Sequence, residues 1–208
     1  MLLILYVILK IRYPKRAAGT LERPDMTQLN VGDTVGHHDL VTIHGKPVRL
    51  PDPECLVHLQ FRRYAGCPVC NLHMRTVAAR HDEILAAGVC EVVVFYSDAE
   101  TMLGFQRALP FATIADPEKK LYAEFGVGTM RYTGAFKPRS WRAAARGLAN
   151  APSLRGIGSK GRSVRGLPAD FLIGTDGTIL AANYGKYTDD HWPVDELLAL
   201  ARGERTSR

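Results

Sequence analysis

The chain has 208 residues, of which 46% are hydrophobic and 23% are charged. This composition is typical of a globular protein with one substantial core, and it excludes a wholly disordered, collagen-like or disulfide-dense chain. The formal net charge of +6 would suit nucleic acid or an anionic membrane if it were spread over the whole fold.

The first 25 residues are predicted to be a leader outside the fold. Residues 1–9 form an unbroken apolar run, but a helix needs about 20 residues to cross a bilayer. Basic residues follow this run instead of preceding it, so it fits a signal peptide poorly. We expect one domain over residues 26–208, beginning at Met26. The alternative is that residues 1–16 form a short anchor on a membrane surface.

From residue 31 onward, predicted strands alternate with predicted helices. Apolar runs rich in β-branched residues predict strands, and proline or aspartate ahead of an apolar face predicts the start of a helix. The turn at Thr175-Asp176-Gly177 predicts a hairpin. This order indicates an α/β domain with a central mixed sheet flanked by helices. The predicted strands are 39–43, 47–50, 56–61, 91–96, 171–173 and 179–181, and the predicted helices are 68–87, 98–109, 118–125 and 193–202.

Residues 131–166 interrupt this pattern and are predicted to be an inserted loop. The segment carries nine basic residues and no acidic ones, and it is long for a connection. Residues 1–25 add five basic and two acidic residues, which leaves 13 basic against 19 acidic residues in the rest of the chain. The predicted domain outside these two segments is therefore mildly acidic, and we expect no nucleic-acid partner.

Cys67 and Cys70 form a C-x-x-C pair directly after a predicted strand and at the start of a predicted helix. A helix N-terminus offers free backbone N–H groups and the positive end of the helix dipole, which together stabilise a thiolate. A second thiol two residues on can resolve a mixed disulfide. A structural zinc site would need two further ligands in a second such pair, which the sequence lacks, and c-type haem would need histidine at Asn71.

The strand, loop and cysteine pair over residues 58–70 resemble the active site of the thioredoxin fold, and most closely that of the AhpC/TSA peroxiredoxin-like family. The resemblance covers residues 30–202 apart from the basic insertion. It implies a thioredoxin-like fold with an N-terminal β-hairpin extension. The other matching segments are Val31-Gly32-Asp33 with Gly45-Lys46-Pro47-Val48, Asp116-Pro117-Glu118 through Gly126-Val127, and Leu167-Pro168 through Ile173 with Asp176-Gly177.

The resemblance implies a thiol-based oxidoreductase that uses the Cys67–Cys70 couple to reduce peroxides or disulfides. It also implies that Leu167-Pro168 is a cis peptide facing the cysteines. Such an enzyme needs no cofactor beyond its redox-active disulfide, which an external thiol system of the thioredoxin or glutathione type would reduce. The alternative is a non-catalytic thioredoxin-fold module whose basic insertion docks an acidic or phosphate-rich partner.

The sequence departs from the family's P-x-x-x-T/S-x-x-C peroxide loop. When Cys70 is aligned with the peroxidatic cysteine, Cys67 stands at the hydroxyl position and Arg63 at the proline position, while Pro168 lies near the place of a late arginine. The choice between peroxide and disulfide, and the identity of the attacking cysteine, therefore stay open at this point.

Several other residues are candidates for supporting roles. Arg62 and Arg63 could add positive potential near the cysteines, Tyr64 could wall the loop, and His73 lies three residues after Cys70.

The remaining polar and cysteine residues have plainer interpretations. His58 is predicted to be a satisfied core residue, and Asp170 a carboxylate at the start of a strand that could influence proton transfer. Cys55 and Cys90 are predicted to be ordinary small apolar residues. A single redox-type pair without a convincing signal peptide predicts a cytoplasmic protein.

Overall fold

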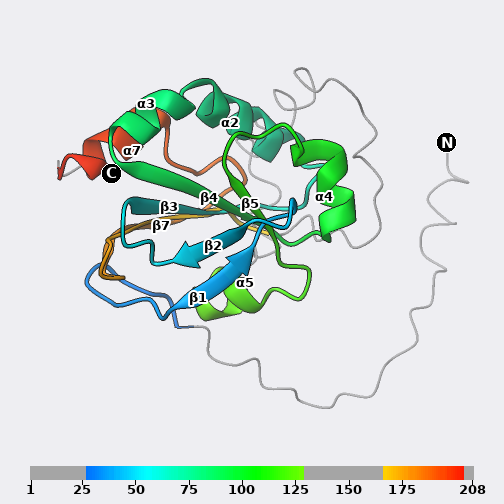
Figure 1. Cartoon of the computed structure of the whole chain (residues 1–208). Coiled ribbons are helices and arrows are strands. Elements are labelled where there is room, and N and C mark those ends of the chain that lie inside the picture. Colours follow the sequence, from blue (N-terminus) through cyan, green and yellow to red (C-terminus); the bar gives the residue numbers. More distant parts are fainter. Residues whose placement is uncertain (1–26, 129–165, 204–208) are drawn as a thin grey trace, which may run out of the picture.

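The computed structural model describes residues 27–128 and 166–203 (Figure 1). The predicted leader and all of the basic insertion except Gly166 lie outside the described residues, so both remain predictions. In the part that is described, no helix is long and apolar enough to cross a membrane.

A five-stranded mixed sheet forms the centre of the fold, with the strand order β5-β4-β3-β6-β7. β3 is parallel to β4, which is parallel to β5, whereas β6 is antiparallel to both β3 and β7. A separate antiparallel hairpin, β1-β2, precedes the sheet. The mixed α/β architecture and the N-terminal hairpin confirm the predicted fold class. The strands are β1 (His38–Val41), β2 (Pro47–Leu50), β3 (Leu56–Phe61), β4 (Val89–Phe95), β5 (Ala112–Ala115), β6 (Ala169–Ile173) and β7 (Ile179–Tyr184).

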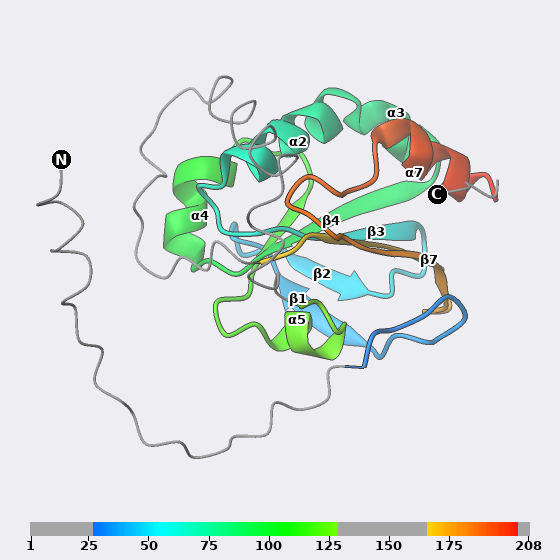
Figure 2. The same cartoon turned by 180° about the vertical axis from the view of Figure 1, so that it is seen from behind.

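Helices and the hairpin cover the two faces of the sheet. In both views α2, α3 and α7 lie over one face, and α5 with the β1-β2 hairpin lies over the other (Figures 1 and 2). The predicted helix over residues 68–87 is two helices, because Arg80 has φ −118° and ψ 20° and interrupts the helical backbone. The helices are α2 (Pro68–Ala79), α3 (His81–Ala86), α4 (Ala99–Gln106), α5 (Lys120–Glu124) and α7 (Val194–Ala201).

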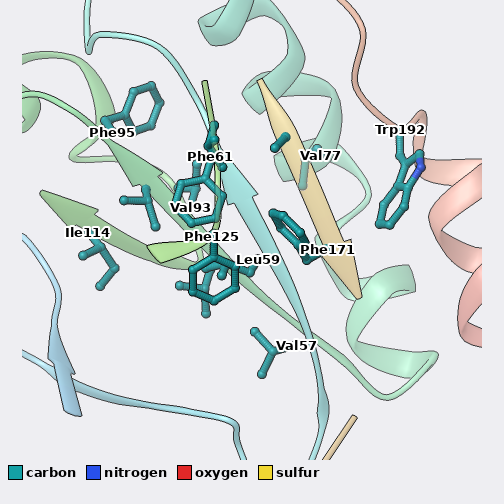
Figure 3. Packing of buried hydrophobic residues seen from close by; sticks show 14 of the residues in the cluster. Val57, Leu59, Phe61, Val77, Val93, Phe95, Ile114, Phe125, Phe171 and Trp192 are labelled. Atoms are coloured by element: carbon teal, nitrogen blue, oxygen red, sulfur yellow. The ribbon is translucent and has the colours of Figure 1, made fainter. Parts of the chain in front are cut away.

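The core is centred on β3, which is buried along nearly its whole length. Phe61 packs on Tyr122 and Phe125, with ring centroids 4.9 and 5.2 Å apart, and Figure 3 shows Phe61 and Phe125 gathered beside Phe171. Strand residues alternate between faces, so His58 and Gln60 point away from this aromatic cluster, toward α2 and α7. The strand that leads to the cysteine loop is thus held by packing on both sides.

Cys55 and Cys90 are joined in a disulfide with a Cα–Cα distance of 6.0 Å, so the prediction that they are ordinary apolar residues is wrong. β3 and β4 are adjacent parallel strands, with Leu56 opposite Val89 and Val57 opposite Cys90. This register brings together two cysteines that are 35 residues apart. The pairing depends on strand register, which cysteine spacing alone does not reveal.

Replacing Cys55 and Cys90 together by alanine should lower the free energy of unfolding by about 2–4 kcal/mol, because the bond closes a long loop in the unfolded chain. The measurement is urea denaturation in a background where Cys67 and Cys70 are both serine, so that only this pair can change its redox state. The same background protein treated with a strong reductant should match the alanine variant. Equal stability with and without the bond would contradict the prediction.

Candidate active site

Cys67 and Cys70 lie at the start of α2, directly after the loop that follows β3. Cys67 is the N-cap residue, and Pro68 occupies the first helical turn, where a missing N–H costs nothing. The Cys67 amide donates to the Tyr64 carbonyl at 2.9 Å, which closes the loop. Both sulfurs are enclosed, with exposed fractions of 0% for Cys67 and 1% for Cys70.

The two thiols have opposite acidities. A hydrogen bond from the Cys70 thiol, the Arg63 guanidinium and the backbone N–H groups of Val69 and Cys70 outweigh burial and lower the pKa of Cys67 to about 6. Burial raises the pKa of Cys70 well above its usual value, and its hydrogen bond to Cys67 and the nearby Cys67 charge raise it further. Cys67 is therefore a thiolate at neutral pH, and Cys70 keeps its proton.

The two candidate arginines have different positions. Arg63 Nη1 lies 3.6 Å from Cys67 Sγ, and its guanidinium carbon lies 5.6 Å from the ring centroid of the buried Tyr64. Arg62 points away into a buried ion pair, with its Nη2 atom 2.6 Å from Asp170 Oδ1. The structure thus places Arg63 beside the Cys67 sulfur and the Tyr64 ring against the Arg63 guanidinium, whereas Arg62 is turned toward Asp170.

Arg62 belongs to a buried cluster of charges between the sheet and the α2–α7 layer. His58 Nδ1 lies 2.9 Å from a Glu91 carboxylate oxygen, and His58 Nε2 lies 3.3 Å from Asp170 Oδ1. The Gln60 amide donates to Glu91 and accepts from Arg62, which joins the two pairs. With His58 protonated, two cations face two carboxylates, and we call His58, Arg62, Glu91 and Asp170 the buried quartet.

Asp170 connects this cluster to the chain near α7. Its Oδ2 atom accepts a hydrogen bond from the Trp192 amide at 3.3 Å, and the Trp192 ring stacks on His58 with centroids 5.6 Å apart. Asp170 lies near the start of β6, where the sequence places a strand carboxylate, and it is fully buried. The Arg62 guanidinium and His58 hold the pKa of Asp170 far below its usual value despite burial.

The stability contributed by His58 should be lost as the pH rises through about 9. Burial alone lowers the pKa of His58, but Glu91 and Asp170 raise it from 6.5 to about 9. The contribution, about 3 kcal/mol, is fully present below pH 6.5, because the folded state binds the proton more tightly than the unfolded state does. The measurement is urea denaturation from pH 6 to 10 of the wild type and of His58→Asn. The difference between the two proteins should shrink toward pH 10, and a constant difference would refute the assignment.

His73 lies on the sheet-facing side of α2 and is 6% exposed. Its ring stacks on His191 with centroids 3.6 Å apart. Burial, together with the neighbouring His191 and Arg62, lowers the pKa of His73 well below 6.5, so the ring is neutral.

Pro168 lies immediately before β6, but the Leu167–Pro168 bond is trans, so the expected cis peptide is a wrong prediction. Among the described residues the cis peptide is Leu50–Pro51. The trans form is the favoured one for an X-Pro bond unless a tight turn imposes the other. Here the Pro168 carbonyl simply accepts from the Gly185 amide at 2.9 Å. Ala169 pairs with Phe61, so Pro168 still lies at the end of β3 from which the cysteine loop departs.

No cluster of three or more His, Cys, Asp or Glu side chains within residues 27–128 and 166–203 is arranged to hold a metal ion. The groups that can take part in chemistry here are the Cys67 and Cys70 thiols, which differ in pKa, and the Arg63 guanidinium beside Cys67. Neither Glu91 nor the ion pair of Asp170 was identified from the sequence. Both could have been found as charged residues inside strands that are otherwise apolar, because a buried charge needs a partner.

Comparison with known proteins relates the chain to thiol-based redox proteins. Residues 31–182 match the AhpC/TSA family. No curated protein shows significant similarity.

Many solved structures share the fold, among them the following three. Peroxidoxin BcpB from Mycobacterium tuberculosis is 21% identical with a TM-score of 0.61, and the alignment covers 86% of this chain and 100% of that one. A putative thiol:disulfide interchange protein DsbE from Chlorobium tepidum is 20% identical with a TM-score of 0.51, over 84% of this chain and 99% of that one. Reduced 2-Cys peroxiredoxin from Plasmodium vivax is 14% identical with a TM-score of 0.58, over 83% of this chain and 80% of that one.

Proposed function

The chain belongs to the AhpC/TSA family, and we propose that it is an oxidoreductase whose Cys67–Cys70 pair cycles between dithiol and disulfide. The observation that carries this proposal is the difference in pKa between the Cys67 and Cys70 thiols. The Arg63 guanidinium lies 3.6 Å from the Cys67 sulfur, whose pKa is about 6, while the adjacent Cys70 thiol stays protonated. An activated nucleophile and a protonated resolving thiol are what a dithiol cycle requires.

A small hydroperoxide is the oxidant that this site favours. Both sulfurs are buried, which suits a compact substrate better than a disulfide on a large protein. Arg63 approaches Cys67 from the loop that joins β3 to α2. It can stabilise negative charge on both the thiolate and the departing oxygen.

The proposed cycle has three steps. The Cys67 thiolate attacks one peroxide oxygen, the O–O bond breaks, and Cys67 becomes a sulfenic acid while the alkoxide leaves and takes up a proton. The Cys70 thiol then attacks the Cys67 sulfur, which forms the disulfide and releases water. An external thiol system of the thioredoxin or glutathione type returns two electrons and two protons, and no other cofactor takes part.

Thiol–disulfide exchange is the second candidate, favoured by the placement of C-x-x-C at a helix N-terminus with the low pKa on its first cysteine. In that reaction the Cys67 thiolate attacks a substrate disulfide, and Cys70 resolves the mixed disulfide. The alternative of a non-catalytic module whose basic insertion, residues 131–166, docks an acidic or phosphate-rich partner remains a prediction, since all of that segment except Gly166 lies outside the described residues.

Single-turnover kinetics separates the candidates. The fully reduced protein is mixed with one equivalent of cumene hydroperoxide or of hydroxyethyl disulfide, and loss of the Cys67 and Cys70 thiols is followed by mass spectrometry after alkylation. We expect hydroperoxide to oxidise both thiols at least tenfold faster, a difference of about 1.4 kcal/mol in activation free energy. A faster reaction with the disulfide would favour exchange, and two unreactive thiols would end the redox proposal.

A further inference from the structure

The loop between β3 and α2 is held at Ala65 by side chains. Ala65 lies in the middle of this loop and is fully buried. Its backbone amide donates to the Ser97 hydroxyl at 3.0 Å. Its carbonyl accepts two hydrogen bonds, one from the Gln106 side-chain amide at 2.8 Å and one from the Asn71 side-chain amide at 2.9 Å. A buried backbone group needs a partner, so these side chains fix the loop at its centre.

The side chains that hold Ala65 come from different parts of the fold. Asn71 directly follows Cys70 on α2, and Gln106 is the last residue of α4. In both views α4 lies beside the start of α2 (Figures 1 and 2). The Gln106 amide also donates to Asn71 Oδ1 at 2.8 Å, which links the two helices directly. The loop is therefore fixed to the helix that begins at the cysteine pair.

Stability alone does not account for Gln106. The side chain is 1% exposed, and its Oε1 atom has no hydrogen-bond partner within residues 27–128 and 166–203. A buried oxygen without a partner costs free energy, and an apolar side chain of the same length would avoid that cost. What the amide supplies is two donated hydrogen bonds, one to Ala65 and one to Asn71.

Arg63 depends on this loop for its place beside the cysteine. Arg63 stands two residues before Ala65, and Cys67 stands two residues after it. The contact of 3.6 Å between Arg63 Nη1 and Cys67 Sγ therefore spans the residue that the side chains hold. The attraction between a guanidinium and a thiolate falls with distance and with the entry of water. A loop that moves away from α2 should lose it.

We propose that Gln106 and Asn71 are positioning residues for the redox reaction, which act through the Ala65 carbonyl to hold Arg63 beside the Cys67 sulfur. This inference rests on the proposed function, because it names the groups that prepare the same site. The hydrogen bond between Cys70 and Cys67 joins α2 to its own cap residue, so it should persist when the loop loosens. The part of the thiolate's stabilisation that comes from Arg63 should be lost.

The test is a pH titration of the full-length reduced protein, in which the ultraviolet absorbance of the Cys67 thiolate is followed. Gln106→Met keeps the length of the side chain and removes both donors. We expect the pKa of Cys67 to rise from about 6 in the wild type to about 7 in this variant, because a nearby positive charge lowers the pKa of a thiol by about one or more. Asn71→Ala, which also removes a donor to Ala65, should raise the same pKa.

The reaction with hydroperoxide gives a second readout. At pH 6 about half of Cys67 is thiolate in the wild type and about a tenth would be thiolate in Gln106→Met. Oxidation by one equivalent of cumene hydroperoxide at this pH should therefore be at least fivefold slower in the variant. The inflection of its pH profile should move upward with the measured pKa.

Two further variants separate positioning from a loss of stability. Met102→Val removes buried atoms from α4 and keeps the hydrogen bonds to the loop, so it should lower the urea midpoint and leave the pKa of Cys67 as it is. In an Arg63→Met background, Gln106→Met should raise the pKa of Cys67 no further, because the contact that it supports is already gone.

An unchanged pKa of Cys67 in both Gln106→Met and Asn71→Ala would overturn the inference, and so would an equal rise in the Arg63→Met background. If the wild type still oxidises Cys67 and Cys70 with hydroperoxide in either case, the proposed function stands and only the positioning role fails. If the wild-type thiols react with neither hydroperoxide nor disulfide, the proposed function fails and the inference falls with it.

Discussion

Replacing Cys67 by serine should abolish the reaction with oxidant, whereas replacing Cys70 should stop the cycle only after its first step. At pH 7 a thiol with a pKa of about 6 is about 90% thiolate. Burial raises the pKa of the Cys70 thiol well above its usual value, so this thiol stays protonated at pH 7. Only the thiolate attacks, so the first step should slow at least a hundredfold in Cys67→Ser. In Cys70→Ser it should proceed within a fewfold of the wild-type rate.

The measurement is consumption of one equivalent of hydroperoxide, with dimedone trapping to locate the sulfenic acid by mass spectrometry. Cys70→Ser should accumulate dimedone-labelled Cys67, and the wild type should form the disulfide without label. The wild-type rate should rise with pH through about 6 and then level off. Near-wild-type formation of sulfenic acid on Cys70 in Cys67→Ser would reverse the two roles and agree with the family alignment that places Cys70 at the peroxidatic position.

Replacing Asp170 by asparagine should lower the free energy of unfolding by about 3–5 kcal/mol, because it leaves the Arg62 guanidinium buried without its partner. Both side chains are fully buried, so water cannot compensate. The double variant Arg62→Leu with Asp170→Leu removes both charges and should lose less stability than the single variant. Chemical denaturation of the three proteins at pH 7 measures the differences.

The matched control is Asp195→Ala, which breaks an ion pair with Arg80 of the same 2.6 Å length on the surface. Asp195 is 85% exposed there, so the loss should be much smaller than for Asp170. If Asp170→Asn costs no more than the surface variant, the buried quartet does not act as an ion cluster. A double variant less stable than the single one would contradict the same reasoning.

Local patterns in the sequence predict most of the elements, because most strands and helices carry their own periodicity and termination signals. The edge strand β5 (Ala112–Ala115) is the exception, since its four residues were not predicted to form a strand. The β6-β7 hairpin is an example, because Gly177 adopts φ +86° at the turn, a conformation that favours glycine. A Cβ atom at this position would also lie only 3.0 Å from the Val35 carbonyl oxygen. The single helix predicted over residues 68–87 fails at Arg80. Its apolar positions continue past that residue and mask the interruption.

Contacts across the sheet were harder to predict. The cysteine pair could be found because its two members are neighbours on one helix turn. Arg62 and Arg63 are also neighbours, yet one binds Asp170, 108 residues away, and the other binds the Cys67 sulfur. Which of the two arginines faces the cysteine depends on the register of β3 against β6, and the sequence shows neither partner nor register.

The chain combines the Cys55–Cys90 disulfide with two free cysteines, Cys67 and Cys70, which the proposed cycle would oxidise and reduce. In that cycle a Cys67–Cys70 disulfide is reduced at every turnover, whereas the Cys55–Cys90 bond contributes to stability only if it survives the same reductant. Such a protein is suited to a specific reductant that reduces the Cys67–Cys70 disulfide, and it is poorly suited to a high concentration of a general thiol, which would also reduce the Cys55–Cys90 bond. In the proposed cycle, the reductant would therefore have to act on the cysteine pair that follows β3 and leave the disulfide at the start of β3 intact.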